Sequence, residues 1–506
     1  MFVRVMLKSY YPLTQYVSIS KTSEEQDFSL PTDGFEATVS MEGELKLRYN
    51  GVRAREYFYR FIKSVEKDGR VPAMYASDYP SFPLRGVVEG FYGKPFSFEA
   101  RMGLMPVLRE LKMNAYIYAP KDDRYHRDLW REPYPEADIA AIGALFRAAE
   151  QNSVDFFFAI SPGKDFCFTD EADYAALLAK LRAVQALGIT RFALLMDDIE
   201  PKLSEQDAAV FASAAEAHAH LAGVILSEIQ PEKPFLFCPT DYMQNFDTPY
   251  RAELRKFLPP ECEVFWTGYN TVAEAITEAD GEAVCATFGR KPILWDNYPV
   301  NDFNPKRRVY LGAVSGRGRF LDRTHIGYIA NLSELYESNM LPLFTMADYA
   351  WDPSAYDADR SLVRAVRWYF GGEEAMPFVL ANADTVMREV SPKRECLMRG
   401  ELEALTDFYL NLQNSASYIE RSFPSLFKEL KEVFLFIEKE IALFDALKGG
   451  KKKQSLAAVK VLAKEMNALK YTAADLSLLQ YANEAYKLTG EEAFTVDEKR
   501  IIYRKW

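Results

Sequence analysis

The chain has 506 residues with a formal net charge of −12, and it is 49% hydrophobic and 26% charged. This composition excludes a disordered, collagen-like or disulfide-scaffold protein, and the length predicts roughly two to four domains. The excess of acidic residues argues against a protein that binds a phosphate backbone, so we expect no nucleic-acid partner.

The cysteines and the apolar runs of the sequence indicate the cellular location of the protein. The five cysteines are scattered and form no C-x-x-C pair, so we expect reduced thiols in a cytoplasmic protein. No stretch reaches the roughly 18 consecutive apolar residues of a membrane-spanning helix, and the first residues lack the apolar core of a signal peptide. We therefore expect no membrane partner. The four histidines leave little material for a histidine-rich metal site.

Residues 1–81 predict a small α/β domain. Short apolar runs such as FVRVML are followed by an Asn-Gly turn signal at Asn50 and Gly51. The segment 52–65 is rich in aromatic residues at helical spacing. We expect this domain to end near the polar, proline-bearing stretch ASDYPS.

Residues 82–354 alternate between short strand-like runs and helical stretches. Eight strand–helix units in about 270 residues predict a (β/α)8 TIM barrel. A doubly wound open sheet is the alternative, but no G-x-G-x-x-G follows the first strand. The predicted strands lie in LRGVVEGFYG, NAYIYAP, VDFFFAISPG, RFALLMDD, PFLFCPTDY, EVFWTG, PILWDNYP and PLFTMADYAW. Between the last two lies one helix candidate, around residues 329–338.

Residues 355–506 predict a helical domain. The strand signal vanishes after about residue 355, and segments such as EALTDFYLNLQNSASYIERSF have apolar residues at three- and four-residue spacing. The predicted fold class is therefore α/β: a TIM barrel (82–354) between a small N-terminal α/β domain (1–81) and a C-terminal α-helical domain (355–506).

The predicted strand ends are unusually polar. Catalytic residues of such barrels lie at the carboxyl ends of the strands, and six of these ends carry carboxylates. We expect them to converge on one rim, together with aromatic side chains that suit a sugar ring. The residues concerned are Glu89 and Tyr92, Lys121 to Asp123, Asp197 and Asp198, Asp241 and Tyr242, Trp295 to Asn297, and Asp348 with Trp351.

The sharpest feature is RFALLMDDIEPKL, a strand that runs into two adjacent aspartates. Neighbouring carboxylates should hold unlike protonation states, one neutral and one ionised. Cleavage of an acetal needs this pair, an acid for the leaving oxygen and a carboxylate that stabilises positive charge. A metal-dependent hydrolase or lyase would also use adjacent aspartates, and a non-catalytic sugar-binding protein is a further alternative.

The same segments resemble glycoside hydrolase family 84, the O-GlcNAcase and hyaluronidase-like β-N-acetylglucosaminidases. The resemblance covers about residues 83–352 and agrees with the three-part organisation. It rests on RGVVEGFYGKPFS, MNAYIYAPKDDRYHRDLWREPYP, VDFFFAISPG, FALLMDDIE, CPTDYM, WTG, WDNYPVND and TMADYAWDP.

The resemblance implies a retaining, substrate-assisted mechanism in which the substrate's own 2-acetamido group is the nucleophile and an oxazoline forms. By match to MDDIE, Asp197 would orient the acetamido N–H and stabilise the charge that develops there. Asp198 would be the general acid and then the base that activates water. No metal or organic cofactor is implied.

The remaining site residues are assigned by motif from the same resemblance. Tyr242 and Asn297 would hold the acetamido arm, and Lys121 with the backbone of Gly90 would bind the 3-hydroxyl side. Asp302 and Asn331 would bind the 4- and 6-hydroxyls. The pocket for the acetyl methyl would be lined by Tyr92, Cys238, Thr267 and Trp295, although Cys238 and Thr267 also fit as barrel filler.

These observations predict an exo-β-N-acetylglucosaminidase that removes terminal GlcNAc from glycoproteins, glycopeptides or oligosaccharides. Degradation of polymer fragments such as hyaluronan or murein is the alternative substrate class, and a catalytically silent GlcNAc-binding protein is the alternative from another class. Helices like those after residue 355 could frame the substrate cleft or form a homodimer.

Overall fold

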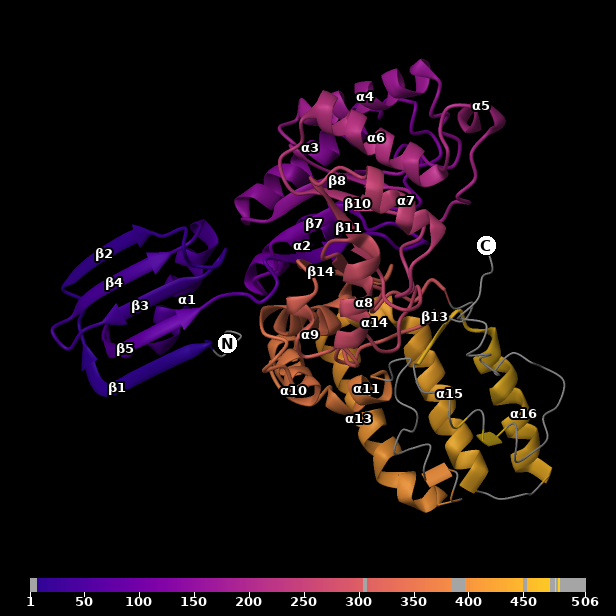
Figure 1. Cartoon of the computed structure of the whole chain (residues 1–506). Coiled ribbons are helices and arrows are strands. Elements are labelled where there is room, and N and C mark those ends of the chain that lie inside the picture. Colours follow the sequence, from indigo (N-terminus) through magenta and orange to yellow (C-terminus); the bar gives the residue numbers. More distant parts are fainter. Residues whose placement is uncertain are drawn as a thin grey trace.

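The computed structural model describes residues 7–303, 307–383, 396–397, 399, 401–448, 453–473, 478 and 481–482. Figure 1 shows an N-terminal sheet at the left, a barrel beside it, and C-terminal helices at the lower right. The predicted apolar run at residues 2–6 and the part of the predicted helical domain beyond residue 482 lie outside the described residues.

The N-terminal sheet has the strand order β1-β5-β3-β4-β2. Helix α1 (Val52–Val65) covers it with a face of buried residues that includes Tyr57, Phe58 and Ile62, which confirms the helix predicted there. Gly51 directly precedes this helix with φ 93, a backbone conformation that glycine adopts without strain. The strands are β1 (Ser9–Val17), β2 (Lys21–Gln26), β3 (Phe35–Val39), β4 (Glu44–Tyr49) and β5 (Val71–Asp78).

Eight parallel strands form a closed barrel, in the order β10-β11-β12-β14-β6-β7-β8-β9. The predicted TIM barrel is confirmed. Buried side chains such as Ile117, Phe157 and Ile293 fill its interior, as in other barrels of this kind. The strands are β6 (Leu84–Val88), β7 (Ala115–Tyr118), β8 (Asp155–Ile160), β9 (Arg191–Leu195), β10 (Phe235–Cys238), β11 (Cys262–Trp266), β12 (Ile293–Asp296) and β14 (Gly327–Asn331).

Most barrel strands are followed by a helix that begins at a side-chain cap. Ser97, Asp170, Ser213, Thr248 and Thr277 each accept a backbone N–H from the first turn, which satisfies donors that the helix leaves unpaired. The helices are α2 (Phe98–Glu110), α3 (Glu136–Gln151), α4 (Glu171–Gln185), α5 (Glu205–Ala208), α6 (Ala214–Ile229), α7 (Pro249–Phe257), α8 (Glu278–Phe288) and α9 (Met340–Trp351).

The prediction of the eighth strand was wrong. The apolar run PLFTMADYAW belongs to helix α9, and the eighth strand is β14, Gly327–Asn331, which overlaps the start of the segment 329–338 predicted as a helix. All residues of α9 except Asp348 are buried. A helix that is covered all round has the same continuous apolar sequence as a strand buried on both faces, so periodicity does not separate them.

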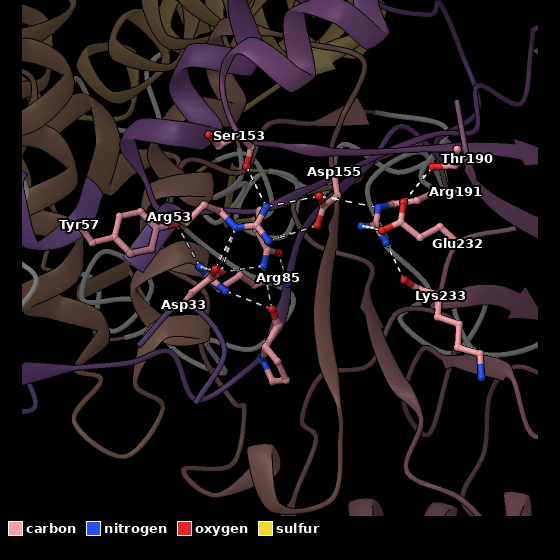
Figure 2. A network of polar contacts seen from close by, with 12 residues as sticks. Asp33, Arg53, Tyr57, Arg85, Ser153, Asp155, Thr190, Arg191, Glu232 and Lys233 are labelled. Carbon is pink, nitrogen blue, oxygen red and sulfur yellow. Dashed lines mark hydrogen bonds and ion pairs between the residues drawn. The ribbon is translucent and has the colours of Figure 1, made fainter. Parts of the chain in front are cut away.

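A polar network joins the N-terminal sheet to the amino ends of the barrel strands (Figure 2). The Arg85 guanidinium, at the start of β6, is 1% exposed and lies 2.9 Å from the Asp33 carboxylate. Asp33 also binds Arg53 of α1 at 3.0 Å, and Arg53 reaches Asp155 at the start of β8. These ion pairs therefore close the end of the barrel that lies opposite to the carboxyl ends of the strands.

In the described ranges, the C-terminal elements are helical apart from one short strand, which pairs with a strand of the loop after β12. β13 (Arg307–Arg308) pairs in parallel with β15 (Tyr471–Thr472). Within the described ranges, no helix combines the length and the apolar composition needed to cross a membrane. The helices are α10 (Ala358–Phe370), α11 (Met376–Ala381), α13 (Thr406–Ser422), α14 (Pro424–Glu429), α15 (Lys431–Lys448) and α16 (Lys453–Ala468), with 3-10 turns η1 (Leu321–Arg323), η2 (Glu337–Asn339) and η3 (Leu402–Leu405).

The predicted boundaries at 81/82 and 354/355 stay predictions, since packing continues across both. Trp351, at the end of α9, lies in the hydrophobic core of the N-terminal sheet. Its indole N–H donates to Asp78 at 3.0 Å, and its ring meets Tyr57 edge to face at 5.5 Å. The barrel's last helix therefore contributes to the neighbouring core.

Candidate active site

A cavity lies at the carboxyl ends of the barrel strands. Its walls come from the strand ends and from the loops that follow them. Every catalytic or binding residue assigned through the family resemblance lines it: Gly90, Tyr92, Lys121, Asp197, Asp198, Cys238, Tyr242, Thr267, Trp295, Asn297, Asp302 and Asn331. The roles assigned to these residues stay predictions.

Asp197 follows β9 and forms a buried ion pair with Lys121, which follows β7. Burial would raise the pKa of Asp197, but the charges of Lys121 and Arg127 outweigh it and lower the pKa below the usual value. Asp197 is therefore ionised at neutral pH, as predicted for one member of the pair. Among the described residues its Oδ1 has no hydrogen-bond partner although it is buried, so one carboxylate oxygen is available to a donor in the cavity.

Asp198 lies between two tyrosine hydroxyl groups. Tyr92 donates to Oδ2 at 2.6 Å and Tyr242 donates to Oδ1 at 2.8 Å. Burial raises the pKa of Tyr92 to about 12, so its hydroxyl keeps its proton and donates. Asp198 has φ 57, a left-handed conformation that aspartate tolerates better than most residues. The backbone after β9 thus turns sharply between the two aspartates.

Arg127 supports both aspartates. Its guanidinium donates to the Tyr92 hydroxyl at 2.6 Å and to the backbone carbonyl of Asp198 at 3.4 Å, and its charge contributes to the lowered pKa of Asp197. Sequence reasoning missed Arg127. The signal was present, because Arg127 stands in the segment KDDRYHRDL, a few residues after Lys121.

A chain of amide hydrogen bonds crosses the cavity wall from β6 to β12. The N–H of Gly90 donates to Asn331 Oδ1 at 3.2 Å, and Asn331 Nδ2 donates to Asn297 Oδ1 at 2.8 Å. The Trp295 indole donates to the same Asn297 oxygen at 3.0 Å, and Asn297 Nδ2 donates to the carbonyl of Thr271 at 2.6 Å. Asn297 and Asn331 are therefore held in fixed orientations.

Asp302 and Cys238 occupy different parts of the cavity. Asp302 lies on the loop after β12 and accepts the Tyr92 N–H at 2.6 Å, and burial raises its pKa. Cys238 ends β10, is 2% exposed and belongs to the barrel interior. Burial raises the pKa of its thiol well above the usual value. Cys238 is thus both barrel filler and cavity wall, and it is a neutral group there.

Several carboxylates predicted for the rim lie elsewhere. Glu89 and Asp296, at strand ends, face the surrounding layer, where they pair with Arg101 at 2.7 Å and Arg317 at 2.6 Å. Alternate residues of a strand point to opposite faces, so a strand-end carboxylate has two possible directions. None of the following lines the catalytic cavity: Glu89, Asp122, Asp123, Asp241, Asp296, Asp348 and Trp351.

Asp348 and Trp351 were misplaced for another reason. Both belong to α9 and not to a strand, and the Asp348 carboxylate pairs with Arg364 of α10.

The cavity wall also includes Thr271, Val272, Val300 and Phe303, which sequence reasoning did not single out. Val300 and Phe303 flank Asp302 in sequence, so their proximity to a predicted residue was their only signal.

No group of three or more His, Cys, Asp or Glu side chains is arranged to hold a metal ion in the part of the chain that the structure describes. The absence of a cofactor stays a prediction.

A family model described as β-N-acetylglucosaminidase matches residues 85–381. The match begins in β6 and extends through the barrel to the end of α11. The chain belongs to this family, glycoside hydrolase family 84. The resemblance drawn from the motifs is thereby confirmed, and the prediction of a glycoside hydrolase is confirmed at the level of the family.

Curated relatives of this family member include the proteins named Protein O-GlcNAcase from Rattus norvegicus and from Mus musculus. Each is 36% identical over 272 residues, which is 53% of this chain and 30% of the relative. The chain thus spans less than a third of the length of these relatives.

Two solved structures resemble most of the chain. The structure named CpGH84B has a TM-score of 0.82 and 24% identity, over 95% of this chain and 99% of that chain, and at this identity it shows the fold alone. A mutant of the Thermobaculum terrenum O-GlcNAc hydrolase has a TM-score of 0.72 and 27% identity, over 81% of this chain and 95% of that chain.

Proposed function

We propose that the protein is a retaining exo-β-N-acetylglucosaminidase that hydrolyses terminal β-linked GlcNAc with help from the substrate's 2-acetamido group. The observation that carries this proposal is the pair Asp197 and Asp198 in one cavity. Asp197 is an ionised carboxylate with one buried oxygen that has no hydrogen-bond partner among the described residues, and Asp198 is positioned by two tyrosine hydroxyls. The buried oxygen of Asp197 is suited to accept an amide N–H, and the position of Asp198 is suited to proton transfer.

In the first step the acetamido carbonyl oxygen forms a bond to the anomeric carbon while the bond to the leaving oxygen breaks. Asp198 gives its proton to the leaving oxygen. Asp197 accepts the acetamido N–H through Oδ1 and stabilises the positive charge that develops on the oxazoline. Lys121 keeps Asp197 ionised throughout, since its ammonium lies against the other carboxylate oxygen.

In the second step Asp198, now a carboxylate, takes a proton from water as the water oxygen attacks the anomeric carbon. The oxazoline opens and the acetamido group is restored. Two displacements at the same carbon return the β configuration. When substrate is bound, the Tyr242 hydroxyl donates its one proton to the acetamido oxygen in place of Asp198.

The sugar hydroxyls meet the other side of the cavity. Asp302 accepts from the 4- and 6-hydroxyls, and Asn331 adds a hydrogen bond there. Lys121 and the backbone of Gly90 bind the 3-hydroxyl side. Asn297 holds the acetamido arm, and Tyr92, Cys238, Thr267 and Trp295 surround its methyl group. Each polar wall residue is already oriented by a neighbour, so little reorganisation accompanies binding.

Replacement of the two aspartates should separate their roles. Asp198→Asn should lower kcat/KM on alkyl β-GlcNAc substrates by about 100-fold or more, and by much less on aryl substrates whose leaving group needs no proton. Asp197→Ala should impair both substrate types, because it acts on the nucleophile. Initial rates on matched alkyl and aryl glycosides measure the difference, and the exposed ion-pair residue Asp128 provides the control variant Asp128→Asn.

Equal losses on both substrate types in Asp198→Asn would contradict its role as the acid. Glucosides that lack the 2-acetamido group should be nearly inert, and their efficient cleavage would exclude substrate assistance. Proton NMR of the first-formed sugar should show the β anomer.

A panel of substrates tests the proposed natural class. We propose O-GlcNAc on protein serine or threonine, in keeping with the names of the relatives. Release rates from GlcNAc-bearing peptides, chitobiose and hyaluronan fragments compare this class with polymer degradation. A protein that binds GlcNAc but releases nothing from an aryl β-GlcNAc would be the silent binding protein instead.

Location and assembly complete the proposal. All five cysteines are free thiols in the structure, in keeping with the cytoplasmic location that we propose. Cell fractionation tests this location, and size-exclusion chromatography with light scattering tests whether the protein forms a homodimer. The absence of nucleic-acid and membrane partners stays a prediction.

A further inference from the structure

The helical region reaches the rim of the catalytic cavity through the strand pair β13–β15. The N–H of Arg307 in β13 donates to the carbonyl of Lys470 at 3.0 Å, next to β15. β13 follows Asp302 in the loop after β12, and Asp302 lines the cavity. A segment from the far end of the described chain thus contacts a loop of the site.

Glu334, on the loop after β14, joins this segment to the loop that carries Tyr92. The Tyr471 hydroxyl donates to the Glu334 carboxylate, which also pairs with Arg307 at 2.9 Å and accepts the Lys94 N–H at 3.0 Å. The Glu334 side chain is 5% exposed. Burial would raise its pKa, but these partners lower it, so Glu334 is an ionised group with several charge-assisted hydrogen bonds.

The backbone of Tyr92 is held from both sides. Its carbonyl accepts from Arg307 at 3.2 Å, and its N–H donates to Asp302 at 2.6 Å. Packing here is tight, since a Cβ at Gly93, with φ +131, would lie 2.4 Å from Glu334 Oε2. The Tyr92 side chain then reaches Asp198 at 2.6 Å. The position of this hydroxyl therefore depends on Arg307 and Glu334.

Helix α15 fixes the segment at its other end. Glu432, in the first turn of α15, accepts the N–H groups of Lys470 at 2.7 Å and Tyr471 at 3.0 Å. A continuous series of hydrogen bonds thus runs from α15 through Tyr471 and Glu334 to the loop of Tyr92.

We propose that Tyr471 is a positioning residue for catalysis: through Glu334 and Arg307 it holds the Tyr92 loop, and through Tyr92 it orients the carboxylate of Asp198. The helical region thereby contributes to proton transfer at a site to which none of its described residues supplies a wall. The proposal rests on the proposed function, because it assigns Asp198 the transfer of a proton.

The kinetic test uses Tyr471→Phe, which removes only the hydroxyl. Misplaced catalytic groups lose rate steeply with distance, so kcat/KM on an alkyl β-GlcNAc should fall by about tenfold. The loss on an aryl substrate with a good leaving group should be below about twofold, because that reaction needs little proton donation. The matched control is Tyr418→Phe, whose hydroxyl bonds Phe370 O within the helical region at 3.5 Å and should leave both rates unchanged.

A double-mutant cycle separates positioning from a general loss of stability. In a Tyr92→Phe background the link to Asp198 is already removed, so Tyr471→Phe should change the alkyl-to-aryl ratio little. The same tenfold change in that background, equal losses on both substrates, or wild-type rates in Tyr471→Phe would each overturn the proposal.

Hydrogen exchange tests the link without relying on activity. The N–H groups of Tyr92, Gly93 and Lys94 are bonded to Asp302, Asp122 and Glu334. Exchange in a peptide that covers residues 90–96 should be faster in Tyr471→Phe than in wild type and unchanged in Tyr418→Phe. Unchanged exchange in Tyr471→Phe overturns the link. Faster exchange in an enzyme that cleaves no β-GlcNAc instead contradicts the proposed function and leaves the structural link in place.

Discussion

Gly90 meets the ring of Trp295 at the cavity wall. A Cβ at this position would lie 2.5 Å from Trp295 Cζ2, closer than atoms pack. Gly90→Ala should therefore displace Trp295 and, with it, the Asn297 amide that its indole orients. We expect kcat/KM for aryl β-GlcNAc to fall by about tenfold or more.

Gly223→Ala is the matched control for this change. Gly223 lies inside α6, where a Cβ would meet Pro259 at 3.8 Å, an ordinary contact. The control should keep full activity and gain about 0.5–1 kcal/mol of stability, because alanine favours a helix over glycine. Wild-type kinetics in Gly90→Ala would show that Trp295 can move without cost to the site.

At the residue scale, the sequence was informative where a family motif assigned roles to individual residues. It placed Asp197, Asp198 and Tyr242 correctly around one cavity. The strand-end pattern alone did not distinguish them from Glu89 or Asp296, because a carboxylate at a strand end faces the cavity or the outer layer according to its register, and only the folded barrel sets that register.

At the scale of elements, Glu429 of α14 caps the 3-10 turn η2. Its carboxyl accepts the N–H groups of Glu337 at 2.9 Å and Ser338 at 2.8 Å. Burial raises its pKa from 4.5 to about 7, and the neighbouring Glu337 charge adds to the rise. The folded state therefore binds this proton more tightly than the unfolded state does.

This shift predicts a pH dependence with a definite sign. Because the folded pKa is raised, the stabilisation is complete below about pH 4.5 and is lost as the pH rises through 7. Glu429→Gln has no such proton, so relative to wild type it should gain about 2 kcal/mol between pH 5 and pH 8. Thermal unfolding of both proteins at the two pH values measures this difference. Glu465→Gln, an exposed site on α16, should show none, and a constant difference for Glu429→Gln would refute the assignment.

The elements show where sequence prediction reached its limit. Seven barrel strands coincide with predicted runs, since short β-branched and aromatic segments between helices have few alternatives. The eighth, GYIAN, contains Gly327 and Asn331, so it was weaker as a strand signal than the apolar helix α9. The sequence does not show how the two segments are buried in the folded protein, and this burial decides which of them is the strand.

At the scale of the molecule, the network around Arg85 attaches the N-terminal sheet to the barrel. Arg85 and Asp33 are both almost fully buried. Arg85→Met should cost about 3 kcal/mol or more of unfolding free energy, because it leaves a buried carboxylate with less compensation. Denaturant unfolding measures this loss.

Arg48→Met is the control, since Arg48 forms an exposed ion pair with Glu36 in the same sheet and should change stability by less than about 1 kcal/mol. At moderate temperature, Arg85→Met should keep kcat/KM within about twofold, because the network lies at the amino ends of the strands, away from the cavity. A large loss of activity with unchanged stability would be inconsistent with a purely structural network.

Helix α9 has a consequence for engineering this protein. Its side chains belong at once to the barrel, to the sheet that precedes it through Trp351, and to the helices that follow it through the pair Asp348–Arg364. A fragment that ends just before or just after this helix leaves a large apolar surface uncovered. Grafting the barrel alone onto another host, or exchanging its flanking parts with those of a relative, would therefore require redesign of every surface that α9 touches.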